Sequence, residues 1–438
     1  GMKIGKLGLE KTLENYLIGT NAIQRYEVNA YGKRINQLEH QKGKQGLRIR
    51  LTVDTEIQKA CGKLLNDRAG SISVMDIYTG DIIAMYSSPS YDPNKFLFGI
   101  SNDDWALIRN NPLKPLINKT LSGLYSPGST IKPIVALSAL ENKIVSPNFK
   151  VKCTGKMELY GQTFHCWKEK GHGFMSLKNA MKQSCDTYFY EVARLLGVDR
   201  LNVTAEKFGL GKKVLGDYYD YEKSGLFPNT KWKKNNLGKG WVLGETLITG
   251  IGQGYTQTTP LQLCLMTAQI ANGGYSIKPR IVVNNNPMSL EEAKSKLQEE
   301  TLHGQEKKLF KDHKNIKIVQ EAMFSSTNEL YGTSYKSRID NPKYQFAGKT
   351  GTAQVKRISM RERELDLKIE QIPYKDRDHA LFVAYGPYVN PRYALSIIVE
   401  HGGSGSRTAA PIAKELFKLI IDRDKLRNKQ KNFEEIDI

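Results

Sequence analysis

Ser129 and Lys132 stand three residues apart in the stretch YSPGSTIKP, and this spacing is the first feature of the chain that suits chemistry. Residues i and i+3 of a helix share a face, so the Lys132 amine can reach the Ser129 hydroxyl and take its proton. A helix N-terminus also offers unpaired backbone N–H groups to a developing oxyanion. Pro127 and Gly128 fit a sharp turn into such a helix, and Pro133 fits its first turn. The stretch therefore predicts a serine nucleophile for acyl transfer.

Two further stretches make the prediction specific, because Ser-x-x-Lys alone recurs by chance in a chain rich in lysine. Ser184 and Asp186 form SCD ahead of a helical aromatic pattern, and Lys349 opens KTGT in a strand-like run. Serine β-lactamases and penicillin-binding proteins carry Ser-x-x-Lys, a second serine motif and Lys-Thr-Gly in this order. The order and the spacing predict one active site built from three separated segments.

The chain resembles the transpeptidase domain of class B penicillin-binding proteins over residues 47–425. Besides the three motifs, the resemblance rests on VDTEIQKACGKLL, GDIIAMYSSPSYDPN, SCDTYFYEVARLLGVDRL, GETLITGIGQGYTQTTPLQL and AGKTGTAQ. Within that family the chain is similar above all to the penicillin-binding protein 2 branch, which serves cell-wall elongation. The resemblance implies an α+β fold of the penicillin-binding and serine β-lactamase type, with a central antiparallel sheet flanked by helices. It also implies that residues 1–46 are the remnant of a pedestal domain and that residues 426–438 form a charged tail.

The same resemblance implies a catalytic role for four side chains. Ser129 would attack the penultimate D-Ala carbonyl of a peptidoglycan stem peptide, with Lys132 as the general base. Ser184 would relay the proton to the leaving group, and Lys349 would hold that relay. An amine of a second stem peptide would then take the acyl group and form the cross-link, while β-lactams would acylate Ser129 as mimics of the donor.

Substrate binding is implied for the residues that flank these four: Asp186, Thr350, Gly351 and Thr352. The backbone N–H groups of Ser129 and Thr352 would form the oxyanion hole, and Gly351 would allow the substrate backbone to come close to the strand. Asp186 stands where many relatives have Asn, which changes the local charge and fits the penicillin-binding protein 2 branch.

Three classes of function remain in competition. The first is a D,D-transpeptidase of cell-wall elongation. The second is a hydrolase of the same fold, a β-lactamase or a D,D-carboxypeptidase, although no additional acidic motif supplies a hydrolytic water. The third is a non-catalytic β-lactam sensor, although the chain shows no signalling segment.

Three cysteines and a histidine gather in one stretch: Cys153, Cys166, His172 and Cys185. Three thiolates and one imidazole suit a closed structural zinc site, although the spacing matches no standard zinc finger. Some proteins resembling penicillin-binding protein 2 place metal ligands at comparable positions. His165 is an alternative fourth ligand, and a Cys153–Cys166 disulfide is the alternative interpretation in an extracytoplasmic setting. Catalysis itself is expected to need no cofactor.

The charge balance bears on partners. The 438 residues include 65 Lys+Arg and 45 Asp+Glu, a formal net charge of +20, which favours anionic surfaces such as lipid headgroups or peptidoglycan. The basic residues are scattered and form no nucleic-acid-reading motif, so nucleic acid is not predicted as a partner. The resemblance implies stem peptides, β-lactams, a membrane glycosyltransferase and elongation-complex proteins as partners.

The N-terminal region bears on location. The chain shows no apolar run of about 18 residues and no signal peptide, and Gly1 before Met2 resembles an expression scar. We expect a catalytic domain in the periplasm, held at the inner membrane by an N-terminal anchor that this sequence lacks.

Hydrophobic patterning predicts the elements that must position the motifs. LRIRLTVDTEIQKACGKLL predicts a strand and then a capped amphipathic helix, and residues 70–93 predict a hairpin at a sheet edge that turns at Thr79 and Gly80. Helical patterns dominate residues 129–272, and three strands and a closing amphipathic helix follow residue 344. Strands at both ends of the chain predict a sheet assembled from the two ends.

Four segments are predicted to be irregular. NAYGKRINQLEHQKGKQG is interpreted as an extended connector, and GIGQGY at 250–255 as a turn near the active site. Residues 211–240 and 355–378 form long polar loops, which favours lids, partner surfaces or disorder.

The remaining candidates have structural interpretations. Tyr188–Tyr190 are predicted mainly as core, although one of three consecutive rings must leave the buried face of a helix. Cys61 and Cys264 are predicted as small core residues. His379 and His401 are not predicted to pair with the nucleophile, because Lys132 already supplies a base.

Overall fold

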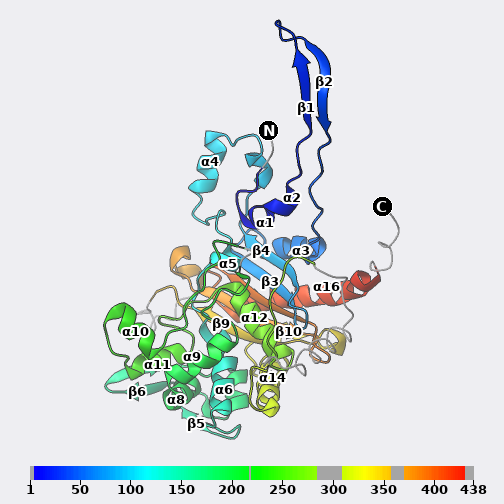
Figure 1. The fold of residues 1–438 in the computed structure, drawn as a ribbon. Helices are drawn as coiled ribbons and strands as arrows, with labels where there is room; N and C mark the ends of the chain where they lie inside the picture. Colours follow the sequence, from blue (N-terminus) through cyan, green and yellow to red (C-terminus); the bar gives the residue numbers. More distant parts are fainter. Residues whose placement is uncertain (1–3, 217–218, 284–307, 357–368, 430–438) are drawn as a thin grey trace.

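The computed structural model describes residues 4–216, 219–283, 308–356 and 369–429, with side chains of the last helix described through residue 424. Its centre is a five-stranded antiparallel sheet in the order β4-β3-β11-β10-β9 (Figure 1). The strands are β3 (Gly70–Asp76), β4 (Ile82–Ser88), β9 (Ala347–Ala353), β10 (His379–Gly386) and β11 (Tyr393–Val399). The β3–β4 hairpin lies at one edge and β9 at the other, so the predicted assembly from both ends of the chain is confirmed.

The sheet is covered on both faces, so its strands are almost continuously buried, and β10 and β11 are mostly apolar. Alternate residues of β10 enter different cores: Leu381 and Val383 belong to the larger hydrophobic cluster, and Phe382 belongs to a second one. The second cluster contains helices α3 (Thr55–Leu65) and α16 (Ala410–Lys429). The larger cluster is built mainly from helices of the central part of the chain.

The central part of the chain is mainly helical. Its helices are α5 (Lys119–Ser122), α6 (Lys132–Glu141), α7 (Leu177–Lys182), α8 (Asp186–Leu196), α9 (Val198–Lys207), α10 (Thr230–Leu237), α11 (Leu243–Gly250), α12 (Pro260–Ala271) and α14 (His313–Asn328). Two small sheets interrupt the predicted helical region, pairing β5 (Val151–Cys153) with β8 (Gly173–Met175) and β6 (Lys156–Leu159) with β7 (Gln162–His165). A short helix, α4 (Asn102–Arg109), precedes them.

Helix α3 begins at the predicted cap. The Asp54 side chain accepts hydrogen bonds from the N–H groups of Glu56 and Ile57 and also pairs with Arg423 of α16. The strand predicted before it is wrong: residues 47–52 contain only an isolated bridge from Leu51 to Val282. Leu51 is 39% exposed, because no sheet of the described residues covers the apolar side of this segment. The alternating pattern therefore does not correspond to a strand here.

The N-terminal segment contains α1 (Gly8–Thr12), α2 (Glu14–Leu17) and a hairpin of β1 (Ile23–Val28) and β2 (Arg34–Gln41) that projects from the rest of the molecule (Figure 1). The extended connector predicted here is therefore wrong. Asn29 organises the turn, because its side chain accepts hydrogen bonds from the N–H groups of Tyr31 and Lys33. The hairpin buries no residue, so hydrophobic patterning gave no signal for it.

The three consecutive aromatic residues of α8 are all buried. Tyr188 and Phe189 lie in the larger core, whereas Tyr190 packs with Phe164 and Leu247 in a third cluster. One ring does leave the main core, as expected, but it stays buried because β7 and α11 cover the other side of the helix. Cys61 and Cys264 are buried as predicted, and burial raises the pKa of the Cys61 thiol to about 12.

Two predicted loops and the tail are described only in part. Residues 211–240 include α10 and a turn in which the Glu222 carboxylate accepts hydrogen bonds from Val214, Leu215 and Gly216, while residues 217–218 lie outside the description. Residues 357–368 of the second loop and 430–438 of the tail also lie outside it, and α16 continues to Lys429. In the described ranges no helix is long and apolar enough to cross a bilayer.

We predict that Phe417→Ala destabilises the fold by about 3–5 kcal/mol, because it removes a fully buried ring and leaves a cavity. The Phe417 ring stacks on Phe346 with ring centroids 5.0 Å apart, which joins α16 to the segment entering β9. Urea unfolding followed by circular dichroism measures the change. Leu419→Ala on the same helix is the control, since Leu419 is 37% exposed; an equal loss in both variants would contradict the prediction.

Candidate active site

The predicted nucleophile lies on a turn pressed between two backbones. Ser129 occupies a short 3₁₀ turn, Gly128–Ile131, that runs directly into α6. Gly128 has φ +53°, and a Cβ there would lie 2.4 Å from the carbonyl oxygen of Thr352. Its N–H donates to the carbonyl of Gly252 at 2.9 Å. Strand β9 and the 250–255 turn therefore hold the nucleophile from both sides, and the expectation that this turn lies near the site is confirmed.

Lys132 is fully buried, and its ammonium group is surrounded by acceptors. Its Nζ lies 2.7 Å from Asp186 Oδ1 and 3.0 Å from the Ser184 carbonyl oxygen, and a longer contact of 3.3 Å reaches Ser184 Oγ. The direct hydrogen bond to Ser129 that the spacing predicted is not formed, and within the described residues Ser129 Oγ has no partner. A buried cation is stabilised more by an anion than by a neutral hydroxyl. Lys132 therefore binds the Asp186 carboxylate and not the Ser129 hydroxyl.

The three motifs meet at the Ser184 hydroxyl. Lys349 Nζ donates to Ser184 Oγ at 2.8 Å, opposite the contact from Lys132. Burial, and then the charge of Lys132, lower the pKa of Lys349 well below its usual value. Ser184 itself has φ +54°, a strained conformation for a residue with a side chain. Two amines and one hydroxyl thus form a chain along which a proton can move.

Asp186 connects this chain to a neighbouring loop. Its second oxygen, Oδ2, accepts a hydrogen bond from the Trp167 N–H at 3.0 Å. The Trp167 indole Nε1 lies 3.1 Å from the carbonyl oxygens of Gln183 and Ser184. Sequence reasoning missed Trp167; its only signal was its place directly after Cys166.

Strand β9 presents the KTGT motif along the site. Thr350 Oγ1 donates to Thr333 Oγ1 at 2.9 Å, which adds another residue that the sequence did not indicate. A Cβ on Gly351 would lie 2.7 Å from Thr130 Cγ2, so this glycine makes room for the nucleophile's turn. The sequence interpretation gave Gly351 a different reason, room for the substrate. The Thr352 carbonyl accepts a hydrogen bond from Gln253 Nε2 at 3.0 Å.

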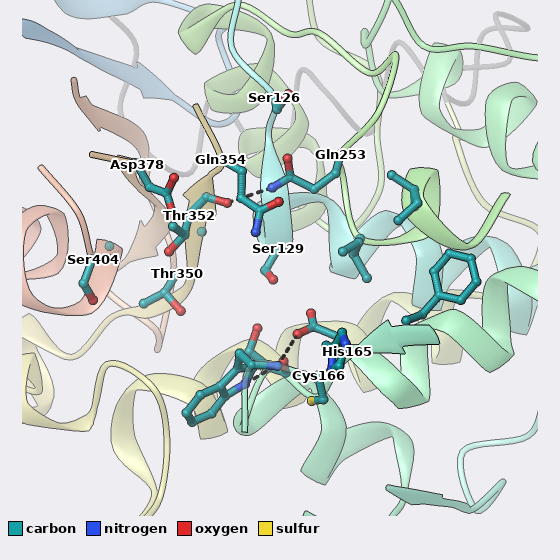
Figure 2. A pocket seen from close by; sticks show the side chains of 18 of the residues that line it. Ser126, Ser129, His165, Cys166, Gln253, Thr350, Thr352, Gln354, Asp378 and Ser404 are labelled. Atoms are coloured by element: carbon teal, nitrogen blue, oxygen red, sulfur yellow. Dashed lines mark hydrogen bonds between the residues drawn. The ribbon is translucent and has the colours of Figure 1, made fainter. Parts of the chain in front are cut away.

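A cleft of about 1750 Å³ opens over these residues (Figure 2). Five of the predicted site residues besides the nucleophile line it: Ser184, Asp186, Thr350, Gly351 and Thr352. Lys132 and Lys349 are buried behind the wall. Gln253, His165 and residues 404–407 also line the cleft, and Figure 2 shows Gln253 reaching across to Thr352. The eight residues predicted for catalysis and substrate binding therefore come together in one place.

The predicted cysteine and histidine ligands also come together. The ligand atoms of Cys153, Cys166, His172 and Cys185 lie within 4.8 Å of one another. His165, the alternative ligand, lines the cleft and is not part of this group among the described residues. All five cysteines are free thiols, so the alternative Cys153–Cys166 disulfide is wrong for this structure. Hydrogen bonds from the Cys185 thiol and, to a smaller extent, from the His172 imidazole lower the pKa of Cys166.

His379 and His401 contact each other and are not part of the cleft lining. The His401 N–H donates to His379 Nδ1 at 3.0 Å, and the two ring centroids are 4.8 Å apart. Tyr125 packs edge-on against His379. Burial, and then the proximity of His401, lower the pKa of His379 to about 4.

Comparison with known protein families defines the class to which this chain belongs. The family described as penicillin binding protein transpeptidase domain matches residues 70–418, and the penicillin-binding protein dimerisation domain matches residues 1–51. The first match spans most of the chain, so the chain belongs to the penicillin-binding protein transpeptidase family. The predicted family and its α+β fold are confirmed.

Individual relatives place it more narrowly. The chain is 35% identical over 422 residues to the peptidoglycan D,D-transpeptidase MrdA of Escherichia coli strain K12, covering 96% of this chain and 64% of that protein. The chain thus spans about two thirds of the length of the curated relatives it matches.

Solved structures agree with these relatives. Pseudomonas aeruginosa PBP2 in complex with WCK 5153 is 36% identical with a TM-score of 0.78, covering 95% of this chain and 84% of that chain. The complex between PBP2 and MreC from Helicobacter pylori is 32% identical with a TM-score of 0.80, covering 95% and 72%. The predicted likeness to the penicillin-binding protein 2 branch is confirmed.

The partly buried His379 makes the stability of the fold depend on pH. His379 binds a proton near pH 4 in the folded protein, whereas an unfolded histidine binds one near about pH 6.5. Below pH 6.5 the unfolded state therefore gains protons that the folded state does not, and stability falls by up to about 3 kcal/mol as the pH approaches 4. Urea unfolding of the wild type at pH 7, 5.5 and 4.5 measures this loss.

His379→Asn is expected to reduce that pH dependence, since Asn keeps an acceptor for the His401 N–H and does not titrate. His40→Asn on the exposed strand β2 is the control. Identical pH dependence in His379→Asn and the wild type would refute the assignment.

Proposed function

We propose that this chain is a peptidoglycan D,D-transpeptidase that cross-links stem peptides through a Ser129 acyl-enzyme during cell-wall elongation. The observation that supports this most is the Ser184 hydroxyl, which lies between two buried lysine amines beside the unpartnered Ser129 hydroxyl. Acyl transfer needs a nucleophile that can lose a proton and a route that returns it to a leaving group. Membership of the transpeptidase family and the likeness to MrdA support the same reaction.

In the proposed acylation, Ser129 Oγ attacks the penultimate D-Ala carbonyl, and Lys132 takes the Ser129 proton. Lys132 acts as a base once its ammonium group has given up a proton, and Asp186 Oδ1 at 2.7 Å is the nearest acceptor. Ser184 Oγ then passes its proton to the amine of the departing D-Ala and takes one from the Lys132 ammonium group 3.3 Å away, which returns Lys132 to its neutral form. Lys349 holds Ser184 Oγ in place at 2.8 Å.

Backbone N–H groups would stabilise the oxyanion. Within the described residues the Ser129 N–H has no acceptor. The Thr352 carbonyl points away from β10, because it accepts a hydrogen bond from Gln253 across the cleft. In an antiparallel pair the N–H and C=O of one residue face the same side, so the Thr352 N–H also faces the cleft. These two donors fit the proposed oxyanion hole.

The substrate would lie along β9. Thr350 and Thr352 project from the same face of the strand, since side chains alternate, and both line the cleft. Their hydroxyl groups would bind the terminal carboxylate of the donor. An amine of a second stem peptide would then attack the acyl-enzyme and form the cross-link.

We also propose a structural zinc ion bound by Cys153, Cys166, His172 and Cys185. His172 Nδ1 lies 3.5 Å from Cys153 Sγ and 3.6 Å from Cys166 Sγ. Ligand bonds of ordinary length in a tetrahedral zinc site place sulfur and nitrogen about 3.6 Å apart, so the residues fit the ion. Zinc would fix the loop that carries Trp167 and thereby the N–H group that holds Asp186.

We further propose that the chain acts at the periplasmic face of the inner membrane with a glycosyltransferase and elongation-complex proteins. The support is the H. pylori relative, a PBP2 in complex with MreC, and a further neighbour described as a peptidoglycan synthase complex. The dimerisation-domain match at residues 1–51 supports the proposed pedestal remnant, and residues 47–425 would form the transpeptidase domain.

Intact-protein mass after incubation with benzylpenicillin tests the function. We expect one penicilloyl group per chain that persists for hours on the wild type, because a transpeptidase lacks a water positioned for hydrolysis. Ser129→Ala is expected to show no adduct, since the nucleophile is gone.

Two results would contradict this prediction. Rapid loss of the adduct would identify a hydrolase, and an adduct that persists on Ser129→Ala would mean that another residue is the nucleophile. Transfer of a donor stem peptide to an amine acceptor then separates a transpeptidase from a β-lactam sensor.

Elemental analysis of protein purified without added metal tests the zinc site. About one zinc per chain is expected, and Cys166→Ser is expected to lower both the zinc content and the rate of acylation by benzylpenicillin. Cys61→Ala is the control, because Cys61 is buried in α3 outside the cluster. Less than about a tenth of an equivalent of zinc in the wild type would refute the site.

A further inference from the structure

Strand β9 is an edge strand whose outer side faces the cleft. An edge strand presents N–H and C=O groups that an incoming peptide can pair with as an added strand. The Thr352 carbonyl faces the cleft, where Gln253 contacts it, and the N–H of the same residue faces the same side because β9 and β10 are antiparallel. An extended acyl donor would bind along β9 with its carbonyl carbon at Ser129. Its own backbone N–H could then donate a hydrogen bond to the Thr352 carbonyl.

In this structure that acceptor is already occupied. Gln253 Nε2 donates to the Thr352 carbonyl at 3.0 Å from the opposite side of the cleft (Figure 2). A side-chain carboxamide has the same donor chemistry as a peptide N–H, so it replaces the hydrogen bond that a bound strand would make. The contact joins residues 99 positions apart, and both residues line the cleft.

The backbone around Gln253 is held firmly. Gly252 has φ +73°, and a Cβ there would lie 2.2 Å from the Gly128 carbonyl oxygen, so the turn packs directly on the nucleophile's turn. The Gln253 N–H donates to the Ile248 carbonyl at 3.1 Å. With the backbone fixed, the flexible part is the Gln253 side chain, which is only partly buried.

We propose that Gln253 caps the Thr352 carbonyl in the free protein and that the acyl donor displaces it on binding. This inference rests on the proposed function of the same site. Gln253 is thus a residue that sets the affinity for the donor: its hydrogen bond must break before the donor backbone pairs with β9. The chemical step follows displacement and does not involve Gln253.

Acylation kinetics with benzylpenicillin on the full chain test the cap. Gln253→Ala and Gln253→Met both remove the donor, and Met keeps the length of the side chain. Each is expected to raise the second-order acylation rate about 2- to 10-fold, the range for one competing hydrogen bond. The apparent dissociation constant for benzylpenicillin is expected to fall, and the limiting acylation rate is expected to stay unchanged.

Gln257→Ala is the matched control, because Gln257 is an exposed glutamine nearby that does not line the cleft. An unchanged or lower rate in both Gln253 variants, with the wild type still acylated at Ser129, would overturn the cap alone. No adduct on the wild type would overturn the proposed function and the cap with it.

A crystal structure of the benzylpenicillin acyl-enzyme gives an independent readout. The ligand amide N–H is expected on the Thr352 carbonyl with the Gln253 side chain moved away. A Gln253–Thr352 hydrogen bond that persists beside the bound ligand would overturn the proposal whatever the kinetics show.

Discussion

The burial of the Lys132 ammonium group is the constraint on which the site depends. A charge without water is tolerated only when anions and dipoles surround it, and here the Asp186 carboxylate and two oxygens of Ser184 do so. This requirement brings the start of α8 against the start of α6. It also explains why a left-handed backbone is maintained at Ser184: the conformation lets both its carbonyl and its hydroxyl face the amine.

The second lysine, Lys349, makes the arrangement suitable for proton transfer as well as for structural support. Lys349 reaches the same hydroxyl from β9, and two cations close together in a dry site disfavour each other's charge. The network therefore favours states in which only one of the two lysines, Lys132 or Lys349, carries a positive charge. A reaction that moves a proton from nucleophile to leaving group needs such a network, whereas a purely structural ion pair needs only one lysine.

The sheet supplies the rigidity that this network needs. Strand β9 pairs with β10 on one side, and on its other side, which faces the cleft, it pairs with no further strand of the described residues. Gly128 lies against the Thr352 carbonyl, and Gly252 lies against Gly128, so three backbones stack without side chains between them. The nucleophile, the strand and the 250–255 turn consequently have nearly fixed relative positions, and the side chains of Gln253 and Trp167 are attached to that frame.

The sequence alone determined the chemistry and most of the elements, because motif order, hydrophobic period and capping residues are local properties. It predicted the β3–β4 hairpin and the Asp54 cap, and it singled out Ser129, Lys132, Ser184 and Lys349, which the fold brings together. Only the tertiary structure decided which residues contact one another. Lys132 pairs with Asp186 because burial makes charge pairing dominant. Gly351 lacks a side chain where Thr130 packs against it, because β9 and the turn that carries Ser129 meet there. Thr333 had no signal in the sequence, Trp167 had only its place after Cys166, and Gln253 had only its place in the turn predicted near the site. Their roles consist of hydrogen bonds to residues distant along the chain.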